Sequence, residues 1–338
     1  MAQVQLADIF QAPEFSKTVQ EAQVVKNAFI MSGVMAADPE LAAACRGTSA
    51  AGERVGITPL GLAEPTYGTD NPADQLTFGK IENQTHKWRR ATRSAGWSAM
   101  NLAQAMAYND PFKGVSAQVG TYWATDNQKR LINSAVGIYN LNAAGTGDLI
   151  KNVATDAAGA ITDAERASAL NFLAALELKG DMDNIAAIAM HSTVYYGLRK
   201  MRALVEQHDP VSNTSFETFE GKRVIVDDGL PVVQGTNRPT FTSILFGAGA
   251  MRSGEGNPPT IRDTEFDRDP KAGNGTGQDF WITRRTDIIM PVGFSFKGSP
   301  GSGIAGQFAT YAELQSAANW EQIWDSKNVA MSFLVTNG

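Results

Sequence analysis

The sequence predicts an α+β fold built around one long helix, and two patterns carry this prediction. From Asp110 to Tyr139, apolar residues recur at helical spacing over roughly 30 residues, which corresponds to a rod of about 45 Å. From residue 163 to residue 335, helical segments alternate with strand-like segments, as in a mixed domain. Because helices of soluble proteins average about 11–12 residues, the long helix is expected to act as a spine.

The spine helix, expected over residues 110–139, begins with a recognisable start signal. The Asp110 carboxylate can cap the first turn, and Pro111 suits the first helical position, where an N–H is not needed. A polar run from Thr125 to Arg130 interrupts the apolar stripe, so we expect it to face solvent or a neighbouring molecule. The apolar stripe comprises Val115, Val119, Tyr122, Trp123, Ile132, Ala135, Val136 and Tyr139.

Composition excludes several classes of protein. The chain has 338 residues, of which 43% are hydrophobic, so it can bury a sizeable core. A net charge of −6 disfavours a dedicated nucleic-acid binder, although a protein that merely encloses nucleic acid remains compatible with it. Cys45 is the single cysteine, so an intrachain disulfide is impossible. We expect no signal peptide in Met1–Gln11 and no membrane span, because no apolar run reaches about 18 residues.

The first hundred residues form extended rather than compact units. Residues 1–45 read as an arm, with helical segments near Phe15–Phe29 and after Asp38-Pro39, and too little apolar surface for a core of its own. Residues 46–95 read as a long hairpin with a turn-rich middle. Such a hairpin exposes strand edges unless another subunit covers them.

The remaining elements follow from periodicity and turn signals. A polar loop is expected over residues 252–278, and a Gly/Ala-rich boundary over residues 143–162. Helices are expected over residues 99–107, 163–178, 192–205 and 307–322, and strands over 185–190, 222–226, 240–246, 280–286, 288–296 and 329–335. In the helix over residues 163–178, the apolar side is expected to comprise Leu170, Leu173, Ala174 and Leu176.

One glycine motif resembles a dinucleotide-binding fingerprint. Gly301, Gly303 and Gly306 match the GxGxxG spacing, with Glu321 about 20 residues beyond the first glycine. Only one further strand follows, so the doubly wound sheet that the motif requires is absent, and a flexible loop is the favoured interpretation. The shorter Gly247-Ala248-Gly249 lacks the third glycine and is a weaker match still.

Metal sites find little support in the sequence. Residues Asp267 to Lys271 begin like a calcium loop, but Lys271 stands where an oxygen ligand is needed. Asp227 and Asp228 could share a metal, yet Asp-Asp-Gly is ordinary turn chemistry, and a turn is favoured. The three histidines, His86, His191 and His208, fall in different elements and lack zinc-ligand spacing.

The sequence gives equally little support for nucleophilic catalysis and for nucleic-acid binding. Ser192 follows His191 directly, and it reads as a helix N-cap rather than as a nucleophile beside its base. Trp88-Arg89-Arg90 with Arg93 could touch nucleic acid, although a solvated strand or a subunit contact is favoured. We therefore predict no catalytic, cofactor-binding or metal-binding residue, and no enzyme.

The order of elements and five stretches resemble the major capsid proteins of tailed bacteriophages with the Hong Kong 97 fold. The likeness spans nearly the whole chain, although none of the stretches is diagnostic alone. They are Asn109-Asp110-Pro111 with Tyr122-Trp123, Gly221 to Pro231, Phe246 to Ala250, Pro291 to Phe296, and Asn319-Trp320-Glu321.

This resemblance implies a division of the chain and a set of partners. The implied function is self-assembly, through hexamers and pentamers, into an icosahedral phage head that encloses double-stranded DNA without sequence-specific binding, in the host bacterial cytoplasm. The implied parts are an N-terminal arm (1–45), an extended loop (46–95), a peripheral domain with the spine helix (96–160), an axial domain (161–296) and a return to the peripheral domain (297–338).

The resemblance also bears on assembly partners. No large charged helical segment precedes the arm, so the resemblance implies either a separate scaffolding protein, which is favoured, or none. It also implies a portal protein and leaves room for a cement protein. Some members of the family form Lys–Asn cross-links; Lys80 and Lys87 lie in the loop, but we do not predict this chemistry.

Two alternatives remain open at this point. An encapsulin-like compartment shell would share the fold, and its cargo would distinguish it. A cytosolic nucleotide-binding enzyme would use the Gly301–Gly306 loop as a small oligomer with a saturable ligand.

Overall fold

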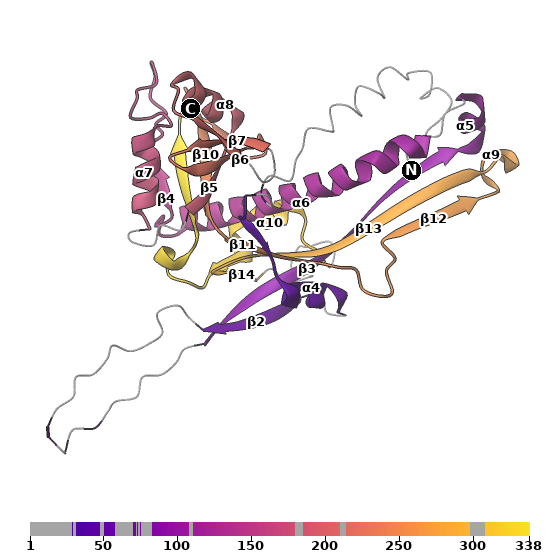
Figure 1. Ribbon diagram of the computed structural model, residues 1–338, viewed down its shortest axis with the longest axis horizontal. Coiled ribbons are helices and arrows are strands. Elements are labelled where there is room, and N and C mark those ends of the chain that lie inside the picture. Colours follow the sequence, from indigo (N-terminus) through magenta and orange to yellow (C-terminus); the bar gives the residue numbers. More distant parts are fainter. Residues whose placement is uncertain are drawn as a thin grey trace.

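A computed structural model describes residues 29, 32–47, 51–57, 70–71, 73, 75, 83–107, 111–179, 185–209, 214–297 and 308–338. The molecule is elongated, and one long helix, α6, crosses it diagonally (Figure 1). Helix α6 spans Pro111–Ala144, or 34 residues, which gives a length of about 50 Å. The predicted spine helix is therefore confirmed, whereas Asp110 and the Gly301–Gly306 loop lie outside the described residues.

A six-stranded sheet lies along α6, in the order β1-β11-β13-β3-β2, with β12 paired to β13. Its centre is the antiparallel pair β3–β13, in register from Met100 opposite Gln278 to Arg90 opposite Ile288. The expected polar loop over residues 252–278 was wrong, because β11 and β12 lie within it. The strands are β1 (Met35–Ala37), β2 (Ala51–Ile57), β3 (Asn83–Met100), β11 (Met251–Glu255), β12 (Thr264–Asp269) and β13 (Gln278–Pro291).

An eight-stranded sheet follows the order β4-β16-β10-β5-β8-β7-β6, with β9 paired to β10. It confirms the strands expected near residues 185–190, 222–226, 240–246 and 329–335. The strands are β4 (Ile150–Asn152), β5 (Ile185–Met190), β6 (Val205–Asp209), β7 (Thr214–Phe219), β8 (Lys222–Val226), β9 (Val232–Gln234), β10 (Pro239–Gly247) and β16 (Met331–Thr336).

The eight-stranded sheet is covered on both faces. On one face, Ala187, Ala189 and Phe333 pack with residues of α6, including Leu131 and Ile138. The alternate residues of the same strands face the opposite core, where helices α7 (Ala169–Glu177) and α8 (Ser192–Lys200) pack. This alternation is the two-residue period of a strand, and it produces a helix–sheet–helix sandwich.

Both covering helices are shorter than the sequence suggested. Helix α7 starts after Ser168, whose side chain accepts a hydrogen bond from the Asn171 N–H at 3.4 Å. At α8 the N-cap is His191, whose Nδ1 accepts from the Thr193 N–H at 3.1 Å, so the expected cap at Ser192 was wrong by one residue.

The arm and the hairpin attach to the six-stranded sheet. Helix α4 (Pro39–Arg46) is capped by Asp38 and buries Leu41 and Cys45 against Trp88 of β3. Strand β2 pairs with β3 from Ala51 to Ile57, which confirms the base of the predicted hairpin. The helix expected near Phe15–Phe29 lies outside the described residues, apart from Phe29 itself.

The C-terminal segment returns to α6. The helix expected over residues 307–322 is confined to α10, whose capping box joins Thr310 and Glu313. Trp320 then donates from Nε1 to the Leu314 carbonyl at 2.7 Å, directly beside Gly137 of α6. The remaining elements are α5 (Asn101–Ala107), α9 (Ala272–Gly275), α10 (Tyr311–Gln315), β14 (Phe294–Phe296), β15 (Trp320–Gln322) and two 3-10 turns (Ala317–Asn319 and Ser326–Asn328).

Candidate functional surfaces

The polar run of the spine helix forms a buried ionic junction with the six-stranded sheet. Arg93 of β3 makes ion pairs with Asp126 of α6 and with Asp287 of β13. Arg130 Nε lies 3.5 Å from the other Asp287 oxygen, and the Asp287 side chain is only 1% exposed. The Tyr311 hydroxyl donates to Asp126, which adds α10 to the junction.

Burial governs the electrostatics of this junction. Burial lowers the pKa of Arg93, and the neighbouring Asp287 opposes that shift by favouring the charged guanidinium. Burial also raises the pKa of Tyr311, so its hydroxyl keeps the proton that it donates. The junction thus joins the spine helix, two strands and the C-terminal segment through buried charged groups. Removing one partner would leave the charge of the other buried and uncompensated.

Asn127 and Gln128 of the polar run are also buried, which corrects the expectation that the run faces solvent or a neighbouring molecule. Asn127 Nδ2 donates to Glu255 at 3.2 Å, and Gln128 donates to Asp227. Trp123 is buried as expected, and its Nε1 donates to Thr283 Oγ1 at 3.3 Å, whereas Tyr122 is 46% exposed. Lys129 is the exposed member of the run.

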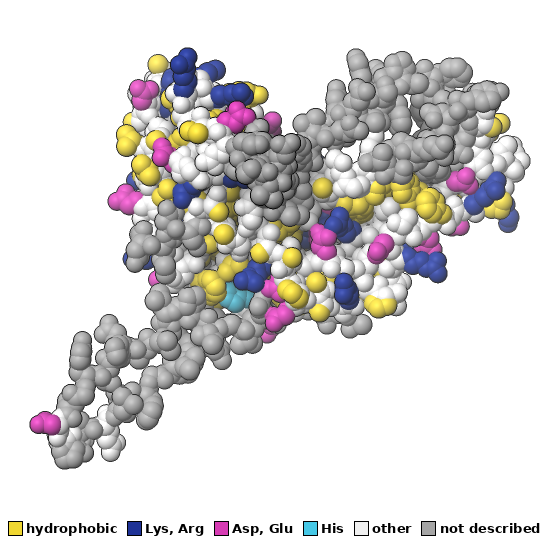
Figure 2. Space-filling model, viewed as in Figure 1, with side chains coloured by type: hydrophobic (Ala, Val, Ile, Leu, Met, Phe, Trp, Pro, Cys, Tyr) yellow, Lys and Arg dark blue, Asp and Glu magenta, His cyan; other side chains and the backbone are white. Residues whose placement is uncertain are grey.

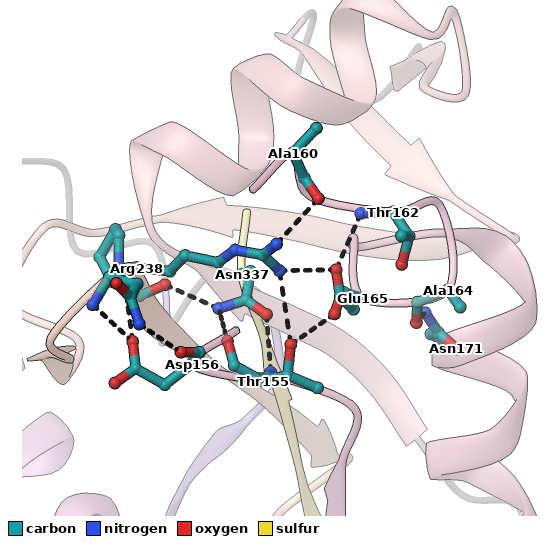
Figure 3. A network of polar contacts seen from close by, with 12 residues as sticks. Thr155, Asp156, Ala160, Thr162, Ala164, Glu165, Asn171, Arg238 and Asn337 are labelled. Carbon is teal, nitrogen blue, oxygen red and sulfur yellow. Dashed lines mark hydrogen bonds and ion pairs between the residues drawn. The ribbon is translucent and has the colours of Figure 1, made fainter. Parts of the chain in front are cut away.

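A second polar network fixes the segment that follows β4 of the eight-stranded sheet (Figure 3). The Asp156 carboxylate accepts hydrogen bonds from the backbone N–H groups of Thr236, Asn237 and Arg238, at 2.8 to 3.0 Å. These bonds, led by that from Asn237, lower the pKa of Asp156. The side chain of Asp156 thereby holds the β9–β10 turn against this segment.

Glu165 and Arg238 complete this network. Arg238 Nη1 lies 2.8 Å from Glu165 Oε2, and Thr155 donates its hydroxyl to the other Glu165 oxygen. The bonds from Thr155 and then Thr162 lower the pKa of Glu165 to about 2. Asn337, next to the last residue, donates to the carbonyls of Thr155 and Pro239, so the segment after β4 and the strand ends form one unit.

Apolar side chains are exposed on the helices of the eight-stranded sheet. Leu170 and Leu173 of α7 are 77% and 49% exposed, although the sequence placed both on a buried stripe. The residues that α7 buries are Phe172 and Ala175. On α8 and beyond, Tyr196, Met201 and Val205 are also exposed, at 55%, 49% and 60%.

The acidic candidates from the sequence prove to be structural. Asp227 accepts from the Gly229 N–H at 2.7 Å, as the favoured turn interpretation requires, while Asp228 accepts from the Ser192 N–H at 3.1 Å. Asp267 and Asp269 lie on strand β12 rather than in a loop. Within the described part of the chain, no three His, Cys, Asp or Glu side chains are arranged to hold a metal ion.

The three histidines have different structural surroundings, and the short glycine motif forms a turn. His86 is buried edge-on against Trp324, and His191 caps α8, while His208 belongs to β6. Gly249 adopts a positive φ of 65° in the turn between β10 and β11, and its N–H donates to the Gly33 carbonyl.

Among the described residues, no helix is long and apolar enough to cross a bilayer.

The arginines of the basic cluster on β3 contact other parts of the same chain. Arg90 is buried and donates to the carbonyl oxygens of Cys45 and Gly47, which secures the end of α4. The Arg89 guanidinium lies over the Phe296 ring at 5.7 Å. Lys87 is exposed 3.6 Å from Glu53, and Lys80 lies outside the described residues.

Two solved phage capsid structures share the fold of this chain. The capsid of Ralstonia phage GP4 aligns with a TM-score of 0.57 at 11% identity, over 77% of this chain and 83% of that chain. The capsid of cyanophage Pam1 aligns with a TM-score of 0.53 at 11% identity, over 90% of this chain and 89% of that chain. The fold is therefore the Hong Kong 97 type of capsid fold, as the resemblance implied.

Sequence comparison then gives the family. No family model matches the chain. It is, however, 30% identical over 334 residues to the major capsid protein of Bacillus phage SPP1, covering 97% of each protein. The chain belongs to the family of phage major capsid proteins. This membership favours the phage coat over the encapsulin-like shell, and it places the chain among structural proteins.

Proposed function

We propose that this chain is the shell subunit of a phage head, assembling through hexamers and pentamers into an icosahedral capsid that encloses double-stranded DNA. The observation that carries the proposal is the 30% identity to a phage major capsid protein over 97% of both chains. Because that match covers 97% of both chains, it supports the same function for the chain as a whole. The setting is the virion, after assembly in the cytoplasm of a bacterial host.

The charge distribution supports enclosure of DNA rather than specific binding. The net charge is −6, and Arg90 and Arg93 of the basic cluster on β3 make their contacts inside the subunit. A sequence-specific binder would instead present such side chains to base edges. We further propose a portal protein and a separate scaffolding protein as partners, with a cement protein on the outer surface.

The division into arm, extended loop, peripheral and axial domains is also a proposal. Strand pairing supports a refinement of its boundaries. Residues 278–288 of β13 pair with β3, and β11 and β12 pair with β13, which supports assigning residues 251–291 to the peripheral domain. Residues 331–336 pair with β10, which supports assigning them to the axial domain.

The test is the size of the assembled product. Wild-type chain, expressed with its scaffolding partner, is expected to sediment as closed particles of megadalton mass and to appear as uniform shells in negative stain. A deletion of residues 61–80, in the turn-rich part of the predicted loop, is the matched control. It should leave a folded subunit, judged by circular dichroism, that fails to close shells.

Two results would contradict the proposal. Wild-type chain that remains a monomer or small oligomer, and binds a dinucleotide with micromolar affinity in calorimetry, would favour the enzyme alternative. Shells that protect a host enzyme, and that protect no DNA after packaging in phage extracts and nuclease treatment, would favour the encapsulin-like alternative.

A further inference from the structure

Helix α7 is apolar on both of its faces, which is unusual for a helix at a protein surface. It buries Phe172 and Ala175 against the eight-stranded sheet, yet it also presents Leu170 and Leu173 outward, one helical turn apart. Figure 2 shows hydrophobic side chains scattered among charged ones on the surface of the part where Figure 1 places the eight-stranded sheet and its helices. A helix that is hydrophobic all round is normally buried on all sides, so a covering partner is expected.

The second exposed apolar surface is formed by α8 and the chain that follows it. Tyr196 and Lys200 share one side of α8 at a spacing of four residues, with Arg199 beside them. Met201 and Val205 continue the exposed apolar surface into β6, the last strand in the sheet order.

These two surfaces lie toward opposite margins of one layer. Helix α7 packs on β4 and β16, which begin the sheet order, whereas Arg199 of α8 reaches Glu217 of β7 near its other end. A copy that presents different surfaces at its two margins can associate head to tail, and such heterologous contacts close into rings.

The charges of the two surfaces are complementary. Helix α7 carries a single charged residue, the exposed Glu177, and no Lys or Arg. The segment from residue 192 to residue 202 carries Arg199, Lys200 and Arg202, all exposed, and no Asp or Glu. At an α8–α8 contact the positive side chains of the two copies would repel each other. A contact between α7 of one copy and α8 of the next is therefore favoured.

We propose that the outer face of α7, defined by Leu170, Leu173 and Glu177, packs against the α8 face of the next copy of this chain, defined by Tyr196, Lys200 and Met201. The occupant is a second copy because phage major capsid proteins associate with themselves, so the inference rests on the proposed function. Leu170 and Leu173 of one copy pack on the apolar surface around Tyr196 and Met201 of the next copy. Glu177 of the first copy then faces Lys200 of the second.

Cysteine cross-linking tests this contact directly. Cys45 is fully buried, and burial raises the pKa of its thiol to about 12, so it stays silent under mild oxidation. In assembled shells of the double variant Leu173→Cys/Tyr196→Cys, we expect a ladder of linked chains on non-reducing gels that ends in closed rings. Each single variant should stay monomeric, and so should the control pair Leu173→Cys/Val233→Cys, because Val233 is exposed outside the α8 face.

Several outcomes would overturn the proposal. Dimers from Leu173→Cys alone would show that α7 meets α7, and well-formed shells of the double variant without cross-links would show that the two surfaces do not meet. A charge test gives a second readout: Glu177→Lys should lower particle yield several-fold, and adding Lys200→Glu should restore it. If wild-type chain forms no shells, the proposed function fails first, and that result differs from shells that form without the cross-link.

Discussion

Lys179 offers a quantitative test of the packing around helix α7. Its side chain is fully buried after the helix, and its Nζ donates to the Ser326 carbonyl at 3.0 Å. Burial lowers the pKa of Lys179 from 10.5 to about 8. The unfolded chain therefore holds this proton to higher pH than the folded chain does, and the subunit becomes more stable as the pH rises between these two values.

The size of the effect follows from the two pKa values. At about 1.36 kcal/mol per pKa unit, the charged amine costs the fold about 3 kcal/mol at neutral pH. The cost falls to about 1.4 kcal/mol near pH 9.5, so the wild-type subunit should gain about 2 kcal/mol over this range relative to Lys179→Met. The methionine has a similar length and no titrating group, so it isolates this contribution.

The assay is urea unfolding of unassembled subunits at several pH values between about 7 and 9.5. Wild type and Lys179→Met should show different pH slopes, with the wild type rising more steeply. Parallel slopes for the two proteins would refute the reasoning, because the amine would then titrate alike in the folded and unfolded chains.

Four further predictions concern the spine helix and the network of Figure 3. Arg130→Ala should lower the free energy of unfolding by about 3–5 kcal/mol, because it breaks a buried ion pair, whereas the exposed Lys129→Ala should cost under about 0.5 kcal/mol; equal melting temperatures would contradict this. Trp123→Ala should cost about 3–5 kcal/mol in the same thermal melts, and a wild-type melting temperature would mean that its indole is not buried. Gly137→Ala should destabilise by about 1–3 kcal/mol, since its Cβ would overlap the Leu314 carbonyl oxygen, and an unchanged melting temperature would show that the backbones are not so close. Glu165→Gln should flatten the loss of stability as the pH falls from about 4.5 to about 2, because the depressed pKa of Glu165 stabilises the fold above that window; an unchanged acid limb would argue against the network.

Local signals explain why the main elements could be predicted from the sequence. Pro111 and the helical spacing that follows it specified the spine helix, and alternating β-branched residues specified the strand at Lys222–Val226. The hairpin base was likewise recoverable from its turn-rich middle. These features depend on residues that are close together in the chain.

The errors came from contacts between distant residues. Arg130 reads as a surface residue until Asp287, far along the chain, supplies a buried partner. Leu170 and Leu173 were assigned to a core that Phe172 occupies instead, since α7 has apolar residues on both faces and periodicity alone cannot choose between them. Strand β12 was missed because an edge strand with exposed polar side chains lacks the hydrophobic signature of a strand.

The family could be identified from the sequence because the order of the elements, taken along the whole chain, is more informative than any single motif. The candidate surfaces were not, since exposure on α7 and α8 depends on which face of each helix meets the sheet. That choice is made by the tertiary structure, and it left Tyr196 and Met201 exposed while Val194 and Leu198 became fully buried.

A cryo-EM reconstruction of the assembled product tests the central claim most directly. The account predicts closed icosahedral shells in which every subunit shows the α6 spine and both sheets, with hexamers and pentamers as the repeating units. A product that stays at the 36.2 kDa mass of one chain, or assembles only into small open oligomers in the presence of its scaffolding partner, would contradict it.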